Sequence, residues 1–152
     1  MNPIFTKLNY KDQSEVAVVN APDAFLPALE TMRPLATIVT DPALIQTGGF
    51  ILAFVKTQQE VDTLTEALAA KVEGDGLLWF AYPKGTSKRH QCEFNRDTGW
   101  AELGKQGFEG VRQVAIDEDW SALRFRRAEY IKKMTRQASR AMSEHGKKRV
   151  AP

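Results

Sequence analysis

The chain has 152 residues, of which 43% are hydrophobic and 26% are charged, and its formal net charge is +2. This length suits one domain with one substantial core, and the composition is ordinary for a soluble globular protein, which excludes wholesale disorder. No apolar run approaches the roughly 20 residues that span a bilayer, and the N-terminus, MNPIFTKLNYKDQ, lacks the apolar core of a signal peptide. We therefore expect a cytoplasmic protein that makes no contact with a membrane.

The first predicted elements are a strand and a helix. Residues 14–20 (SEVAVVN) are a valine-rich run bounded by polar residues, which is typical of a central strand covered on both faces. A helix should follow, because Asn20 can cap it and Pro22 suits its first turn. The inner face of this helix is predicted to hold Phe25, Leu26 and Leu29.

Two further strands are predicted at residues 35–40 (LATIVT) and 50–56 (FILAFVK). The segment between them, DPALIQTGG, is shorter than the ten to twelve or more residues that a helical crossover usually needs. The strand at 35–40 is therefore expected to be short or to lie at an edge of the sheet.

The clearest helix begins at Thr57, which forms a capping box with Glu60. Apolar residues repeat along it at helical spacing, namely Val61, Leu64 and Leu68, and Gly74 and Gly76 end it. The run that follows, LLWFAYP at 77–83, predicts a central strand with both faces buried. Leu78 and Phe80 should lie on one side of the sheet, and Leu77, Trp79 and Ala81 on the other.

The chain continues at residues 83–90 with the basic loop PKGTSKRH. A short helix should follow, capped by Asn95 or Asp97, with Trp100 and Leu103 facing inward. Residues 109–116 and 120–126 are two strands separated by an acidic turn short enough for an antiparallel hairpin. Beyond them we expect a helix that frays into a disordered end.

Strands that alternate with helices and finish in a hairpin predict a three-layer Rossmann-like α/β sandwich, with a mostly parallel sheet ending in an antiparallel hairpin. This domain should occupy residues 1–131. Residues 132–152 should form a basic C-terminal extension, partly helical or disordered.

This strand order resembles that of the class I methyltransferases, whose sheet also closes with a hairpin in which the last strand runs antiparallel. The segment GGFILAFVKTQQEVDTLTEALAAKVEGDGLLWFAYPK carries the likeness to their central strand, helix, glycine turn and strand. The segments VAVVNAPDAF, LLWFAYPKGTSK, NRDTGW and VRQVAIDEDWSALRFR look like those of a family of small bacterial proteins of unknown function. That second resemblance covers most of residues 7–131 and implies a fold without an established activity.

The methyltransferase resemblance implies a glycine-rich turn after the first strand and an acidic residue after the second. In this chain the first turn is NAPDAF, where Asn20 and Pro22 stand in place of glycines, so we expect no adenosylmethionine pocket of that kind and no cofactor. Asp41 follows the second strand and can be the acidic residue that holds the ribose hydroxyls of the ligand in that family. An Asp before a Pro is also a common start of a turn.

Candidate ligand-binding residues are those predicted at the carboxyl ends of the parallel strands, where open sheets bind ligands. Hydroxyls, amides and cations of the loop after residue 83 can cradle an anion there. The set comprises Asn20, Asp41, Tyr82, Lys84, Ser87 and Lys88. The alternative is that this loop only marks where a buried strand leaves the core.

No catalytic or metal constellation is evident. Cys92 is the only cysteine, so the chain has no intrachain disulfide and no cysteine cluster for a metal. His90 and His145 are far apart in sequence, and a pairing of His90 with Cys92 lacks an orienting acid. We expect a non-catalytic binding protein whose partner is a small anion, a nucleotide or a protein; the alternative is a divergent methyltransferase or another nucleotide-using transferase.

Charge is distributed unevenly along the chain. Residues 126–152 carry nine Lys or Arg against two Glu, a net charge of +7, which leaves −5 on the first 125 residues. A basic tail can make weak nucleic-acid contacts, because each neutralised phosphate releases counterions. It can equally lie against its own acidic body or stay solvated.

Overall fold

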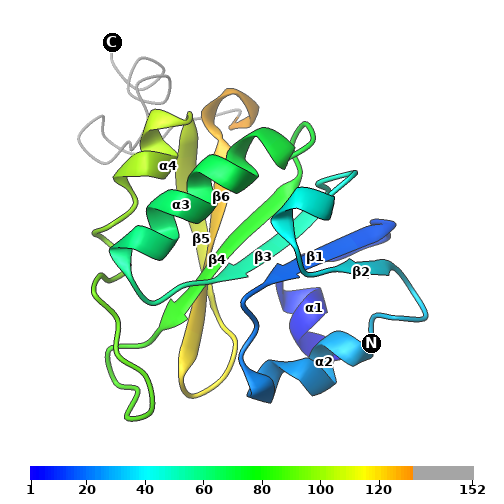
Figure 1. Cartoon of the computed structure of the whole chain (residues 1–152), viewed down its shortest axis with the longest axis horizontal. Coiled ribbons are helices and arrows are strands. Elements are labelled where there is room, and N and C mark those ends of the chain that lie inside the picture. Colours follow the sequence, from blue (N-terminus) through cyan, green and yellow to red (C-terminus); the bar gives the residue numbers. More distant parts are fainter. Residues whose placement is uncertain (132–152) are drawn as a thin grey trace.

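The computed structural model describes residues 1–131 and contains one six-stranded sheet between helices (Figure 1). The strands are β1 (Glu15–Val19), β2 (Thr37–Val39), β3 (Phe50–Phe54), β4 (Leu77–Pro83), β5 (Phe108–Ala115) and β6 (Trp120–Arg127). The helices are α1 (Pro3–Lys7), α2 (Leu26–Glu30), α3 (Gln58–Leu68) and α4 (Ala101–Lys105). The order in the sheet is β2-β1-β3-β4-β6-β5.

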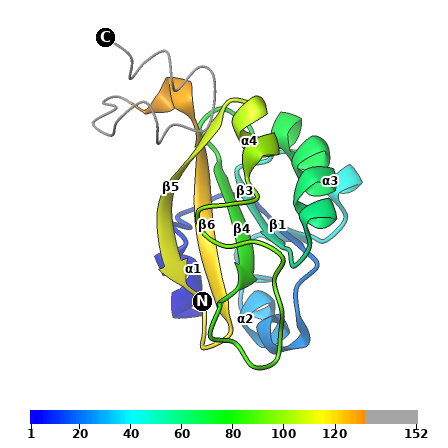
Figure 2. The same ribbon diagram turned by 90° about the vertical axis from the view of Figure 1, so that its left-hand side faces the viewer.

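The first four strands are parallel, and β6 runs antiparallel to both β4 and β5. Helices α3 and α4 cover one face of the sheet, and α1 and α2 pack on the other (Figures 1 and 2). The predicted Rossmann-like sandwich with a closing antiparallel hairpin is therefore confirmed. None of the helices in residues 1–131 is long and apolar enough to cross a membrane.

Strand β4 is the centre of the core, and all seven of its residues are buried. Leu78 and Phe80 lie in the cluster under α3 and α4, whereas Leu77, Trp79 and Ala81 lie in the cluster under α1 and α2, as the alternation predicts. Both faces are covered because helices connect the parallel strands. The indole Nε1 of Trp79 donates to the Leu8 carbonyl at 2.9 Å, so this large ring is buried with its polar atom satisfied.

Strand β2 has three residues and lies at the edge of the sheet, paired with β1. Both predictions made from its short connection to β3 are confirmed. The connection is a single 3-10 turn over Pro42–Leu44, which is too short to pack as a helical layer.

The predicted N-terminal cap of the second helix is wrong. Asn20 adopts a left-handed conformation with φ of 60°, and the helical segment begins later, as a 3-10 turn at Asp23–Phe25 that continues into α2. The residue at the cap position is Pro22, and it makes no side-chain hydrogen bond there. The positive φ turns the chain at Asn20, so its side chain does not reach the helix end.

The predicted inner face of α2 is wrong at one position. Leu26 is 43% exposed, while Phe25, Leu29 and Met32 are buried. Their spacing of four and three residues already fills one helical face, which leaves Leu26 outside it.

The cap predicted for the short helix α4 is also wrong. The helix begins at Ala101 after Trp100, with no side-chain cap. Asn95 instead accepts hydrogen bonds from the amides of Asp97 and Thr98 in the preceding turn. Trp100 and Leu103 are buried as predicted. The predicted helix beyond the hairpin lies outside the described residues, apart from a 3-10 turn at Ala128–Tyr130.

Candidate anion site at the carboxyl edge of the sheet

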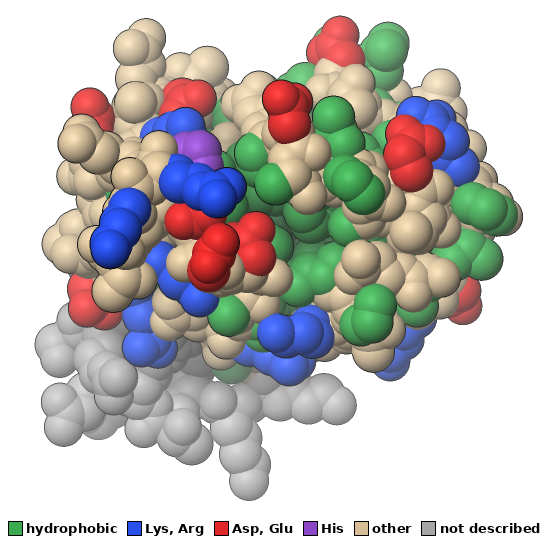
Figure 3. Space-filling view, turned by 90° about the horizontal axis from the view of Figure 1, so that it is seen from below, with side chains coloured by type: hydrophobic (Ala, Val, Ile, Leu, Met, Phe, Trp, Pro, Cys, Tyr) green, Lys and Arg blue, Asp and Glu red, His purple; other side chains and the backbone are tan. Residues whose placement is uncertain are grey.

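The carboxyl ends of β1, β3 and β4 lie side by side, because these strands are consecutive neighbours in the parallel part of the sheet. Strand β1 lies between β2 and β3, and the chain passes from β1 to β2 on one side of it. The strand order therefore reverses at β1, and open α/β sheets bind ligands at such a topological switch point. Figure 3 views the molecule from this side. Lys and Arg side chains gather on part of this face, close to acidic ones.

The loop after β4 is held against the β5–β6 turn by Ser87. Its hydroxyl donates to Oδ1 of Asp119 at 2.8 Å and accepts from the amides of Arg89 and His90 at 3.3 and 3.2 Å. The Lys84 amide donates to the Asp119 carbonyl at 2.8 Å. Ser87 therefore fixes the loop, which places the lysines on either side of it at a defined edge of the molecule.

A buried tryptophan underlies this edge. Trp120 begins β6, and because β6 is antiparallel, its first residue lies at the carboxyl ends of the parallel strands. Its ring contacts Phe54 edge to face at 5.1 Å between centroids. His90 lies against it at 5.1 Å, and the Lys56 ammonium lies 5.9 Å from the ring centroid, within reach of a cation–π contact.

The sequence did not predict this arrangement of His90 and Lys56 over Trp120. The usable signal was the hairpin itself, because a predicted final antiparallel strand brings its first residue to this edge.

Four cations at this edge form no ion pair within residues 1–131. They are Lys56, Lys84, Lys88 and Arg89. Two of the neighbouring carboxylates accept local hydrogen bonds: Asp117 accepts from the amides of Asp119 and Trp120, and Asp119 accepts from Ser87. An anion arriving here meets cations without a direct carboxylate partner.

Tyr82 does not join this cluster. Its ring packs against Phe94 and Trp100 on the α3 and α4 face, and its hydroxyl accepts a hydrogen bond from Nε2 of Gln113 at 2.9 Å. Burial raises the pKa of Tyr82 to about 12. The structure thus places this predicted ligand residue inside the core, as a strand residue with a satisfied hydroxyl.

Asp41 and Asn20 lie on other parts of the same edge. The Asp41 carboxylate accepts from the Ala43 amide at 2.9 Å and caps the 3-10 turn at Pro42–Leu44, as the turn interpretation predicts. It follows β2, three strand positions from β4, which is roughly 14 Å at the usual strand spacing. Asn20 is exposed at the end of β1, two positions from β4. Of the six predicted residues, the structure brings together Lys84, Ser87 and Lys88.

The reactive side chain nearest this loop is unactivated. Burial raises the pKa of the Cys92 thiol, with the Glu93 carboxylate adding to the effect against a backbone hydrogen bond from Phe94. A thiol with a raised pKa is protonated at neutral pH and is a poor nucleophile. Within residues 1–131, no three His, Cys, Asp or Glu side chains are close enough together to hold a metal ion.

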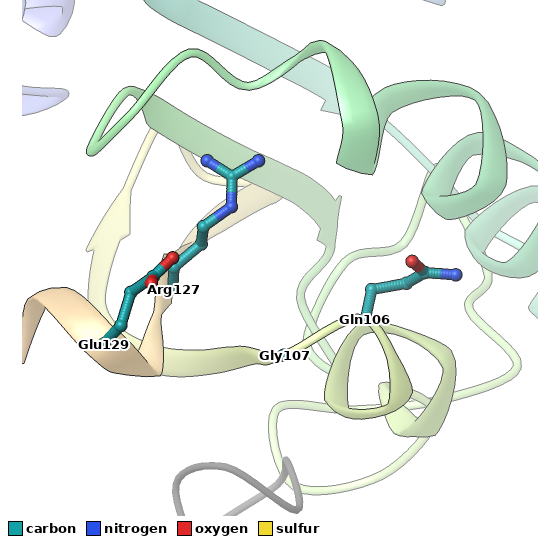
Figure 4. A pocket seen from close by; sticks show the side chains of 4 residues that line it. All are labelled: Gln106, Gly107, Arg127 and Glu129. Carbon is teal, nitrogen blue, oxygen red and sulfur yellow. The ribbon is translucent and has the colours of Figure 1, made fainter.

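A pocket of about 230 Å³ lies at the opposite end of the sheet, lined by Gln106, Gly107, Arg127 and Glu129 (Figure 4). The Arg127 guanidinium donates to the carbonyls of Gly74 and Ala69 and lies over the Phe108 ring. This arginine thus holds the turn after α3 against the end of β6, which is a structural role.

The turn after β1 is filled by protein. Phe25 is 5% exposed, and its ring packs against Phe5 and Phe54 at 5.8 and 5.1 Å. A side chain of this size occupies the space beside the first strand where a glycine turn would let a ligand approach the backbone.

The comparisons with known proteins support the fold. No family model and no curated protein matches the sequence. The tRNA methyltransferase TrmK of B. subtilis is similar in structure, with a TM-score of 0.50 at 11% identity over 93% of this chain and 74% of that one.

Two other solved structures are more distant. A protein in the NADB-Rossmann superfamily from Streptococcus agalactiae has a TM-score of 0.47 at 11% identity over 84% of this chain and 68% of that one. The N-methyltransferase NodS from Bradyrhizobium japonicum has a TM-score of 0.43 at 20% identity over 74% and 73%. The likeness to TrmK, at 11% identity, shows a Rossmann-like fold of the methyltransferase type and nothing of the chemistry.

Proposed function

We propose that this protein is a non-catalytic binding protein that takes a small anion, phosphate or the phosphate of a nucleotide, at the loop after β4. The observation that carries the proposal is the group of unpaired cations, Lys84, Lys88 and Arg89, on a loop that Ser87 ties to Asp119. A loop already held in place loses less conformational entropy when it binds a ligand. Lys56 adds a fourth cation from the end of β3.

Binding without catalysis is supported by the state of the reactive groups around the loop. The Cys92 thiol and the Tyr82 hydroxyl are protonated at neutral pH, and burial raises the pKa of each further above it. The His90 ring lies against Trp120. None of these side chains is paired with an acid or base that would activate it, which general acid–base or nucleophilic catalysis requires.

The test is the double substitution Lys84→Ala/Lys88→Ala. Phosphate or ATP should raise the melting temperature of the unsubstituted protein, by an amount equivalent to about 2.7 kcal/mol at a hundred times Kd. The double variant should show a clearly smaller shift than the unsubstituted protein, while its stability without ligand stays within about 0.5 kcal/mol of the original.

Lys11→Ala/Lys105→Ala is the matched control, because it removes the same charge from exposed positions elsewhere. The proposal is wrong if the control loses the shift in melting temperature equally, or if the unsubstituted protein shows no shift. The loop would then only mark where a buried strand leaves the core.

A divergent methyltransferase is the second candidate, and the TrmK-like fold supports it as a fold. The turn that Phe25 fills argues against an adenosylmethionine pocket beside β1. We expect adenosylmethionine to bind no tighter than about 1 mM, equivalent to roughly 4 kcal/mol. Calorimetry that gave a micromolar Kd would favour the enzyme over the binding protein.

A further inference from the structure

A second group of cations lies on the side of the sheet that carries α1 and α2, away from the loop after β4. Arg124 and Arg126 of β6 alternate with Leu123 and Phe125, which belong to the opposite core cluster, so both arginines face the α1 side. Figure 2 shows β5 and β6 at this end of the sheet, with α3 and α4 to one side and α1 to the other.

A β-bulge brings a third arginine to the same place. Gly110 pairs with Phe125, but the next pair along the ladder is Arg112 with Arg124, so Val111 is an extra residue in β5. Without the bulge, Val111 would lie opposite Arg124. Bulges re-aim side chains, and two like charges directly opposite each other on adjacent strands destabilise a sheet. The pairing of Arg112 with Arg124 is therefore electrostatically unfavourable.

Neither Arg112 nor Arg124 forms an ion pair within residues 1–131. Arg126 is neutralised by Asp75, with 2.7 Å between Nη2 and Oδ2. Arg112 has only the neutral Asn9 amide, whose Oδ1 accepts from Nη1 at 3.0 Å. The Arg124 guanidinium makes no hydrogen bond to any residue in 1–131, and its Nε is inaccessible to solvent.

Arg124 is consequently both charged and incompletely satisfied. Burial lowers the pKa of its guanidinium, and Arg126 and Arg112 act in the same direction against Asp75. A guanidinium nevertheless remains protonated in proteins. A buried donor without an acceptor is costly, and each one in a folded protein calls for an explanation such as a bound ion.

We infer that Arg112 and Arg124 form an anion site that binds a phosphate group. Planar guanidinium forks match phosphate oxygens in paired hydrogen bonds, and the negative charge offsets the repulsion between the two side chains. Free phosphate and a phosphodiester of a nucleic-acid strand present the same chemistry, and this site is independent of the one proposed at the loop after β4.

The site can be observed directly through the arginine Nε–Hε resonances in nitrogen–proton NMR spectra. In the Lys84→Ala/Lys88→Ala protein, where the other proposed site is absent, inorganic phosphate or a short oligonucleotide should shift the Arg124 resonance saturably. A shift with inorganic phosphate identifies a free phosphate compound as the ligand, and a shift with the oligonucleotide alone identifies nucleic acid.

Substitution separates this site from nonspecific attraction. Arg112→Met should weaken the apparent affinity by about tenfold, because a charge-assisted hydrogen-bonding partner is removed. The same change at Arg33, whose guanidinium bonds only to Glu30, should leave the affinity unchanged. No saturable shift with either ligand, or an unchanged affinity in Arg112→Met, overturns the inference.

A stability measurement provides a second readout. If Arg124 is kept for binding, Arg124→Met should melt at the same or a higher temperature without ligand, because an unsatisfied donor and a repulsive charge are removed. A melting temperature lowered by several degrees would show that the guanidinium is a structural group, and the inference would then be wrong.

Discussion

Burial decides what individual side chains at the carboxyl edge can do. Tyr82 lies near the end of β4, and Cys92 lies in the segment that follows this strand. Desolvation raises the pKa of each. The lysines a few residues away are exposed or half-exposed. Along β4 and its loop, burial ends at Pro83, and the cations that can meet a ligand lie beyond it.

Tyr82 gives this boundary a measurable pH dependence. Its folded-state pKa of about 12 lies above the ordinary value of 10.0, so folding favours the protonated form. The associated stability is fully present below pH 10 and is lost as the pH rises through about 12. The free energy of unfolding of Tyr82→Phe, measured in urea, should fall less steeply over that range than that of the unsubstituted protein. Parallel curves from pH 10 to 12 would contradict the assigned shift.

At the scale of single elements, the sequence was enough to predict features whose hydrogen bonds join residues close together in the chain. The capping box of α3 is one case: the Thr57 hydroxyl accepts from the Glu60 amide at 3.1 Å, and the Glu60 carboxylate accepts from the Thr57 amide at 3.1 Å. The carboxylate also accepts from the Lys56 amide at 2.8 Å. This helix follows β3 directly, so the same cap fixes the chain where Lys56 joins the candidate site.

Thr57→Ala should lower the free energy of unfolding by about 1 kcal/mol, because the Glu60 amide loses its acceptor. Thr57→Ser is the matched control and should retain most of the stability, since it keeps the hydroxyl. Urea denaturation of both variants measures the difference. Equal losses in the two variants would mean that the methyl group, and not the cap, stabilises this end of α3.

The elements that sequence reasoning misassigned depend on geometry that a sequence window does not contain. Asn20 is a good capping residue, but its positive φ turns the chain away and the helix starts beyond it. The bulge that brings Arg112 opposite Arg124 has no Gly or Pro at the extra position, which is Val111.

The candidate site was predictable to the same limited extent. The sequence predicted the strand order and the position of the loop after β4, which carries Lys84, Ser87 and Lys88. The hydrogen bond from Ser87 to Asp119 could not be predicted, because it depends on two segments 32 residues apart.

At the scale of the whole molecule, charge is distributed unevenly along the chain. The body, residues 1–125, carries −5, yet both of its proposed anion sites are local groups of cations. We therefore expect any long-range attraction of a polyanion to come from the C-terminal end, where the charge is +7 over residues 126–152. The predicted extension at 132–152 lies outside the described residues, and its role stays a prediction.

Truncation after Ile131 tests that role. It removes seven Lys or Arg and one Glu. Nucleic-acid binding, followed by fluorescence anisotropy at several salt concentrations, should fall to whatever the Arg112 and Arg124 site retains. The dependence of log K on log salt should flatten by about 0.7 to 0.9 for each phosphate that the shortened chain no longer neutralises.

The melting temperature of the truncated protein should stay nearly unchanged, because the sheet and its covering helices lie within residues 1–131. A full-length variant with the same seven basic residues replaced by Gln is the matched control, and it should lose binding equally if charge alone is responsible. If the truncated chain unfolds while the Gln variant melts normally, the extension is a packed part of the domain. The boundary at 131 would then be wrong, and the weak binding would have to be assigned to the body.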